Sequence, residues 1–268
     1  MGGTEPIISL HRAAGLSFPD REARAVGGSE RGGQAFLEQP EVREVMQYQL
    51  LFAPVFANMD HLLTGAWITI QLSFVAMILG LIVGVVLAFA KTGGPPPLRW
   101  LIDAYIELVR NTPFLAQIYF IYFALPEFGI RMTPNTAAIV ALVVNVGAFA
   151  TEIIRAGIES IAKGQVEAGV ALGLNRLQIF RYIILKQAVR TIYPALTSQF
   201  VYLMLSTSVV SVISATDLAA AGNDIQQRTF TAFEVYLVIT GMYLVMSLGF
   251  SGLFRLIQRL AFNYPLSR

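Results

Sequence analysis

Long apolar runs alternate with shorter polar segments along the chain, and each run has the length of a membrane-spanning helix. The clearest run extends from Leu62 to Ala90 without a charged residue. A helix of about 20 apolar residues crosses the hydrocarbon layer of a bilayer. The pattern therefore predicts an all-α polytopic membrane protein, with spans at about 62–90, 98–125, 132–154, 191–216 and 233–254.

The second predicted span is unusual because it begins with charged residues. Glu107 and Arg110 are three positions apart, so a helix places them on one face. They either pair with each other at the cytoplasmic interface or face a central cavity, and the sequence leaves both interpretations open. Pro113 follows Thr112 and cannot donate a backbone hydrogen bond, so the helix is expected to kink or unwind there. We assign these four residues a structural role.

Polar side chains also lie within the predicted spans. An intramembrane asparagine such as Asn145 is more often a link between helices than a ligand. Serine and threonine commonly bond back onto their own helix. Five hydroxyl residues between Ser206 and Ser214 exceed that need and favour a wet pathway. The residues predicted to line the pathway are Gln117, Asn145, Glu152, Ser206, Thr207 and Ser208.

The charges of the connecting segments predict an orientation. Basic connections occur at 91–99, at 155–190 and in the C-terminal tail, and they alternate with near-neutral or acidic ones. Cytoplasmic loops carry the excess of Lys and Arg. Five spans then place the N-terminus outside, and the C-terminus and the segment 160–190 in the cytoplasm.

The segment 160–190, which we call the helical loop, has the pattern of a short amphipathic hairpin. Apolar residues recur at helical spacing among charged ones, and Gly173 interrupts them, which predicts a helix, a tight turn and a second helix. Such an element either docks into a groove on another protein or is a solvated connector. The residues expected to dock are Glu167, Ala168, Gly169, Leu172 and Gly173.

Composition narrows the possible chemistry. The 268 residues are 55% hydrophobic and 13% charged, with a net charge of +2, and nothing indicates a nucleic-acid partner. The chain has no cysteine, and its two histidines, His11 and His61, precede the first apolar run, so no metal site is expected. A phosphate-binding loop of the Gly-x-x-x-x-Gly-Lys type is absent from the sequence, so the chain is not expected to hydrolyse ATP or to be an enzyme.

Residues 1–45 differ from the rest because they are rich in Gly, Glu and Arg and have no long apolar run. This composition is typical of a disordered tail. Alternatively, translation begins at Met46 and the preceding residues are not made. Under both interpretations, residues 46–268 are expected to be the transmembrane domain.

Three motifs resemble those of one transporter family. The spacing Glu167-Ala168-Gly169, three residues, Gly173, nine residues, Ile183-x-Leu185 is similar to the EAA loop of ABC importer permeases. Residues 107–117 resemble the Glu-x-x-Arg-x-Thr-Pro-x-x-x-Gln motif of polar amino-acid permeases, and residues 229–236 follow in the expected order. The sequence departs from the family at Gly169, where Ala is usual, and at Lys186, where Pro is usual. Leu205 and Ser206 stand where Lys followed by Asp or Asn is frequent.

The resemblance implies a permease subunit of a polar amino-acid ABC importer, of the histidine/glutamine permease family, in the bacterial inner membrane. It implies a type I core of five helices and a second, identical or paralogous permease subunit. It also implies an ATPase dimer that binds ATP and Mg and contacts the EAA loop, and a periplasmic solute-binding protein. Membrane lipid surrounds the assembly, and no cofactor is expected in this chain. The alternative is a secondary, ion-coupled transporter, which usually shows internal repeats that this sequence lacks.

Overall fold

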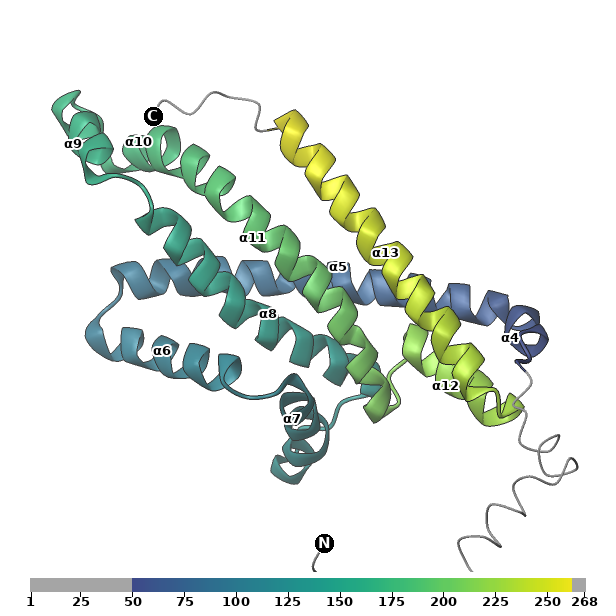
Figure 1. Cartoon of the computed structure of the whole chain (residues 1–268). Coiled ribbons are helices and arrows are strands. Elements are labelled where there is room, and N and C mark those ends of the chain that lie inside the picture. Colours follow the sequence, from purple (N-terminus) through teal and green to yellow (C-terminus); the bar gives the residue numbers. More distant parts are fainter. Residues whose placement is uncertain (1–49, 262–268) are drawn as a thin grey trace, which may run out of the picture. The chain divides into compact units, whose positions relative to one another are not determined.

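The computed structural model describes residues 50–261, and every regular element in this range is helical. The chain divides into two units at Leu50, and the description below concerns the second unit. Figure 1 shows the arrangement of its helices. The elements are α4 (Ala53–Ala57), α5 (Met59–Gly93), α6 (Pro96–Arg110), α7 (Phe114–Tyr119), η1 (Phe120–Ala124), η2 (Leu125–Phe128), α8 (Pro134–Glu159), α9 (Lys163–Ala171), α10 (Arg176–Ile179), η3 (Phe180–Ile184), α11 (Leu185–Ser206), η4 (Thr207–Ile213), α12 (Leu218–Thr229) and α13 (Ala232–Ala261).

Four of the described helical stretches are long and apolar enough to cross a membrane, and Phe114–Phe128 forms a shorter apolar one. They overlap the apolar runs predicted at 62–90, 132–154, 191–216 and 233–254, and the all-α class is confirmed. The long stretches are Met59–Gly93, Pro134–Glu159, Arg176–Ile213 and Ala232–Ala261.

The run predicted at 98–125 has a different structure. No single helix follows it, because α6 ends at Arg110 and α7 begins at Phe114. Pro113 supplies the physical reason, since its ring clashes with the preceding turn and its nitrogen has no proton.

The near-neutral connection between the predicted spans 191–216 and 233–254 contains the helix α12. Asp217 caps its N-terminus by accepting a hydrogen bond from the backbone N–H of Ala220 at 2.7 Å. Leu218, Ala221 and Ile225 are buried at helical spacing, and the polar side chains between them hid this pattern in the sequence.

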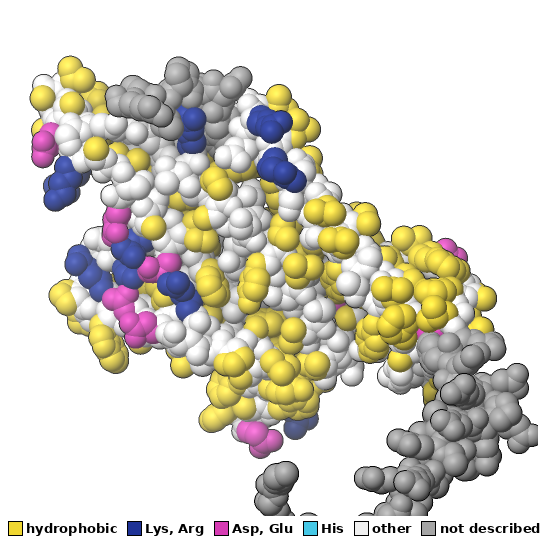
Figure 2. Space-filling view, in the orientation of Figure 1, with side chains coloured by type: hydrophobic (Ala, Val, Ile, Leu, Met, Phe, Trp, Pro, Cys, Tyr) yellow, Lys and Arg dark blue, Asp and Glu magenta, His cyan; other side chains and the backbone are white. Residues whose placement is uncertain are grey.

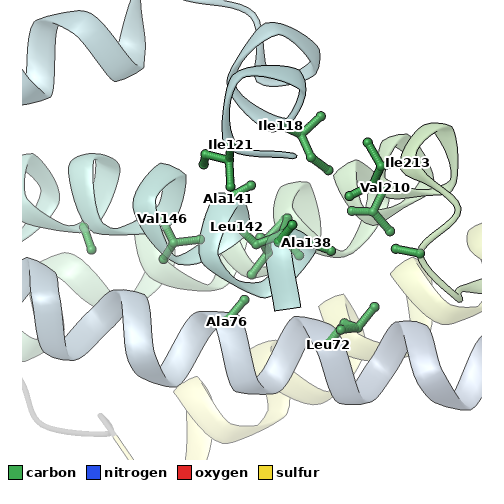
Figure 3. Close-up of a cluster of buried hydrophobic side chains, with 14 of the residues drawn as sticks. Leu72, Ala76, Ile118, Ile121, Ala138, Ala141, Leu142, Val146, Val210 and Ile213 are labelled. Carbon is green, nitrogen blue, oxygen red and sulfur yellow. The ribbon is translucent and has the colours of Figure 1, made fainter. Parts of the chain in front are cut away.

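The helices α5 and α8 approach each other closely at glycines. A Cβ atom added at Gly80 would lie 2.6 Å from Cβ of Val146, and one added at Gly84 would lie 2.6 Å from Cβ of Ala150. Small residues allow such contacts between helices in lipid, where packing rather than the hydrophobic effect drives association. Figure 3 shows the apolar cluster built on this pair. Its labelled members are Leu72, Ala76, Ile118, Ile121, Ala138, Ala141, Leu142, Val146, Val210 and Ile213.

A second apolar cluster joins α4, α5, α12 and α13, with Leu62, Leu218 and Val235 among its buried members. Glu234, at the start of α13, is fully buried there and accepts a hydrogen bond from the backbone N–H of Leu51 at 2.6 Å. This carboxylate fastens the segment before α4 to α13. The acidic position of the 229–236 motif therefore has a structural function in this chain.

The outer surface of the bundle is largely apolar. Large side chains such as Trp67, Val86 and Val245 are more than half exposed, and hydrophobic atoms cover much of the face in Figure 2. A soluble monomer rarely exposes contiguous apolar patches of this extent. The surface indicates contact with lipid or with other membrane-embedded chains.

Candidate functional site

The helical loop begins with α9, whose C-terminus is closed by its own backbone. Gly173 has φ +76°, and its N–H donates to the carbonyl of Val170 at 2.9 Å. The N–H of Leu174 donates to the carbonyl of Gly169 at 3.1 Å. These two bonds form a Schellman motif, which requires a left-handed residue and so favours glycine. The predicted helix, turn and second helix are confirmed.

The second half of the helical loop begins with a capping box. The side-chain oxygen of Asn175 accepts from the N–H of Gln178 at 2.9 Å, and the Gln178 side chain accepts from the N–H of Asn175 at 2.9 Å. This reciprocal pair starts α10, which continues through the π-helical turn η3 into α11. The sequence signal is Asn-x-x-Gln, which our sequence analysis missed.

Gly169 lies on the inner side of the helical loop. A Cβ atom added there would lie 2.7 Å from Cδ1 of Ile183 and 3.2 Å from Cγ1 of Ile179. The side-chain amide of Gln187 donates to the side-chain oxygen of Gln165 at 2.6 Å and ties α11 to α9. The absence of a side chain at Gly169 therefore lets the two halves of the loop pack closely. This inward position distinguishes Gly169 from the other residues predicted to dock.

The outer side of the helical loop has exposed apolar side chains. Leu172 is 79% exposed and Leu177 is 75% exposed, on either side of the Gly173 turn. Glu167 and Ala168 are also exposed on α9, and Glu167 forms no ion pair within the described part of the chain. Apolar side chains exposed on a hairpin that its own hydrogen bonds close are typical of a docking surface.

The Gln117 side chain satisfies backbone carbonyls at the helix interruption before Pro113. The carbonyl of Val109 would normally accept from the N–H of residue 113, which proline lacks. The side-chain amide of Gln117 donates to this carbonyl at 2.7 Å, and also to the carbonyl of Thr112 at 3.1 Å. Asn145, only 8% exposed on α8, donates to the side-chain oxygen of Gln117 at 3.0 Å. The structure thus gives these two predicted pathway residues a role in closing the break.

Glu107 and Arg110 do not form the pair that we considered, since no ion pair joins them among the described residues. The Arg110 guanidinium instead lies over the ring of Phe149 on α8, 5.5 Å from its centroid. The Thr112 hydroxyl donates to the carbonyl of Leu108 at 2.7 Å. These contacts agree with a structural role for the predicted residues around the break.

Glu152 lies in a charged cluster at the end of α8. Its carboxylate accepts from Nζ of Lys91 at 2.8 Å and from Nη2 of Arg155 at 2.7 Å. Both partners are basic side chains of this chain, and the serine and threonine hydroxyls of α11 and η4 are not among its contacts. The carboxylate of Glu152 is thus engaged by two cations of its own chain.

Ser206, Thr207 and Ser208 stand where α11 tightens into the 3₁₀ helix η4. Each hydroxyl donates to a backbone carbonyl three or four residues earlier in its own helix, at 2.8 to 2.9 Å. Thr207 is fully buried, whereas Ser206 and Ser208 are half-buried. These bonds are the helix-internal alternative that we weighed, and they leave the hydroxyl oxygens of the two serines able to accept.

A groove of about 390 Å³ runs between α11 and α13. Figure 1 shows these helices side by side, and the Tyr193 hydroxyl donates to the carbonyl of Phe254 at 3.1 Å. The Arg255 guanidinium on the groove has no acidic partner among the described residues. The polar side chains of the groove are Thr197, Ser198, Ser251, Arg255 and Gln258.

Comparison with known proteins gives a consistent result. Residues 51–262 match the family described as "Binding-protein-dependent transport system inner membrane component". The glutamine transport system permease protein GlnP of Escherichia coli (strain K12) is 37% identical over 213 residues, which cover 79% of this chain and 97% of the relative. The probable glutamine ABC transporter permease protein GlnM of Bacillus subtilis (strain 168) is 35% identical over 211 residues, 78% of this chain and 98% of the relative.

A solved structure described as "Crystal structure of an amino acid ABC transporter with histidines" has a TM-score of 0.75 and 35% identity to this chain. The match covers 79% of this chain and 99% of that chain. The fold and the sequence therefore lead to the same family.

The chain belongs to the family of binding-protein-dependent transport system inner membrane components. It is a multi-pass permease subunit of the inner membrane and is not itself the ATPase. The family implies ATPase subunits and a binding protein as partners. The resemblance to polar amino-acid ABC importer permeases is confirmed.

Proposed function

We propose that this permease subunit translocates glutamine or a closely related polar amino acid. Two relatives that align over nearly their whole length are named as glutamine permeases, and the similar solved structure is described as an amino-acid transporter. Alternating access is the mechanism, in which a motion of the ATPase dimer rocks the spans about a central pathway.

In this proposal the broken segment α6–α7 completes a type I core of five spans within residues 46–268. The N-terminus lies outside and the C-terminus lies in the cytoplasm, because the basic connections then share the cytoplasmic side. Residues 1–45, expected to be a tail or a mis-assigned start, lie outside the described residues.

The single observation that best supports coupling to an ATPase is the exposed leucine pair of the helical loop. Leu172 and Leu177 lie on either side of a turn that its own backbone and caps stabilise. A preformed hairpin loses little conformational entropy when it docks. We propose that it fits a groove of the ATPase subunit, which supplies the ATP and Mg, and that a second permease subunit, identical or paralogous, completes the pathway.

For the pathway we propose the groove between α11 and α13. Ser198 lines this groove, and Tyr202 and Ser206 follow it at spacings of four residues on the same face of α11, so in this proposal the pathway extends along them toward η4. The Arg255 guanidinium fits the carboxylate that every amino acid has. Gln117, Asn145 and Glu152 would then support the pathway from behind rather than line it.

The docking proposal is tested by recovery of the ATPase subunit. The tagged permease is solubilised with its co-expressed partners, and the ATPase that purifies with it is quantified. We expect Leu172→Glu to lose the ATPase. Phe128→Glu is a matched control, because Phe128 is 76% exposed in η2, on the outer side in the proposed orientation, and its variant should retain the ATPase. Equal recovery with both variants would contradict the assigned docking surface.

Transport is tested in proteoliposomes with the solute-binding protein present. ATP-dependent uptake of labelled glutamine is expected, and Arg255→Gln should reduce the rate of uptake with less effect on ATP hydrolysis. Uptake that requires an ion gradient and no ATPase would instead support a secondary transporter.

A further inference from the structure

Five charged side chains meet where the ends of α5 and α8 come close to the middle of α6, and Figure 2 shows acidic and basic groups gathered in this region. Nζ of Lys91 on α5 lies 2.6 Å from Asp103 on α6 and 2.8 Å from Glu152 on α8. Arg155 extends the cluster to Glu159, at 2.5 Å. One lysine therefore joins carboxylates from two other helices.

The centre of the cluster is shielded from solvent. The side chains of Lys91 and Glu152 are 18% and 19% exposed, whereas those of Asp103 and Glu159 are 45% and 56% exposed. A shielded pair is screened less by salt than a surface pair. Removing the lysine would leave the carboxylates of Asp103 and Glu152 without their shared cation. The polar link between α6 and α8 at this position therefore depends on Lys91.

The position of the cluster connects it to the helical loop. The last two turns of α8 contain Glu152 and Glu159, and the chain enters α9 only a few residues later. On the return, α11 packs against the same turns, since a Cβ atom added at Gly157 would lie 2.0 Å from Cγ2 of Ile192. The end of α8 thus packs directly against α11, the helix into which the helical loop continues.

Polar contacts attach the helix α6 to α8 and to α5. The Tyr105 hydroxyl donates to the carbonyl of Val144 on α8 at 2.6 Å. Two residues earlier on α6, the carboxylate of Asp103 pairs with Lys91 on α5. The turn between α5 and α6, at Gly94 and Pro95, is held by the N–H of Gly94 donating to Ala90 at 2.8 Å. Lys91 is thus the point where α5, α6 and α8 are fastened together beside the helical loop.

We propose that Lys91 and Glu152 are positioning residues for energy coupling, which make the α5–α6 turn move together with α8 when the ATPase displaces the helical loop. The proposal rests on the proposed function, because it requires an ATPase that docks on the helical loop. The two residues themselves lie outside the docking surface. Neither residue needs to contact the solute or the ATPase. Their effect is on how much solute moves for each ATP that is hydrolysed.

The test is the ratio of solute transported to ATP hydrolysed in proteoliposomes that contain the complete importer. We expect Lys91→Met to assemble with the ATPase and hydrolyse ATP, while the ratio falls by roughly fivefold or more, the scale of a typical coupling between sites. Lys91→Arg retains the cation and should retain most of the ratio. Arg131→Met removes an exposed cation from the link before α8 and should leave the ratio unchanged.

A double variant shows whether Lys91 and Glu152 act through their mutual contact or independently of each other. If the two side chains act through their mutual contact, Lys91→Met with Glu152→Gln lowers the ratio no further than the worse single variant. A ratio equal to wild type in Lys91→Met would overturn the proposal, as would an equal loss in Arg131→Met. Transport and hydrolysis that fall in proportion would also overturn it, since that result indicates lost assembly. Failure of wild type to bind the ATPase would reject the proposed function itself.

Discussion

Two of the helix interruptions in the described residues, at Pro113 and at Gly173, are built in opposite ways. At Pro113 the backbone groups left free are satisfied by Gln117, which Asn145 on another helix supports. At Gly173 they are satisfied within the helical loop, by the Schellman bonds and the Asn175–Gln178 capping box. The first break includes a side chain from another helix of the bundle, and the second uses only its own residues.

The difference reflects the surroundings of each break. Without water to hydrogen-bond free carbonyls, an interruption among apolar helices persists only where protein groups replace the solvent. An interruption on a wet surface can be closed locally, which leaves its apolar side chains available to a partner. The first break is therefore part of the scaffold, and the second is a module that can be displaced as a unit.

The largest expected effect is a loss of stability when the Gln117 side chain, which bonds the free carbonyls at Pro113, is replaced. Gln117→Leu leaves the Val109 carbonyl and the Asn145 amide without a bond, and each unsatisfied group costs about 1–3 kcal/mol. We expect the free energy of unfolding, measured in mixed detergent and SDS, to fall by about 3 kcal/mol. A loss below about 1 kcal/mol would show that the break does not rely on this amide.

A smaller effect is expected at the turn of the helical loop. Gly173→Ala forces a residue with a Cβ atom into the left-handed region, which should cost about 1 kcal/mol. Nothing lies within 4 Å of the added atom, so backbone strain is its only direct effect. Gly129→Ala is the control, because Gly129 has φ +83° and equally open space. Both variants should lose similar stability, but only Gly173→Ala should weaken retention of the ATPase subunit.

The smallest effect sharpens the comparison, because the same exchange is made at the second break. Gln178→Leu removes the capping-box bond to the N–H of Asn175, which is exposed and can bond water instead. We expect the free energy of unfolding to change by about 0.5 kcal/mol. A loss as large as that of Gln117→Leu would show that the helical loop is as dependent on its polar contacts as the buried break.

Much of the architecture could be predicted from local patterns. The apolar runs predicted the long helices, and Gly173 predicted the turn of the helical loop. Pro113 predicted the interruption, although not that it would divide the run at 98–125 into separate helices. The helix α12 escaped prediction, because short amphipathic helices with many polar residues resemble connections in composition.

The candidate site was less predictable than the fold. Ser206, Thr207 and Ser208 were assigned by composition, and their hydrogen bonds run within their own helix. Glu152 pairs with Arg155, three residues away on the same helix, but also with Lys91, 61 residues away in the chain. Contacts over such distances leave no periodic trace in one sequence.

The sequence by itself determined where helices form, where they must break and which segments face water, because hydrophobic periodicity and the constraints of Pro and Gly act over a few residues. Only the tertiary structure decided what each polar group does. Asn145 supports Gln117 at the break from another helix, Gly169 lets two helices touch, and Lys91 joins three helices. The physical reason is that a hydrogen bond or an ion pair depends on positions within about 3 Å, which packing of distant segments sets.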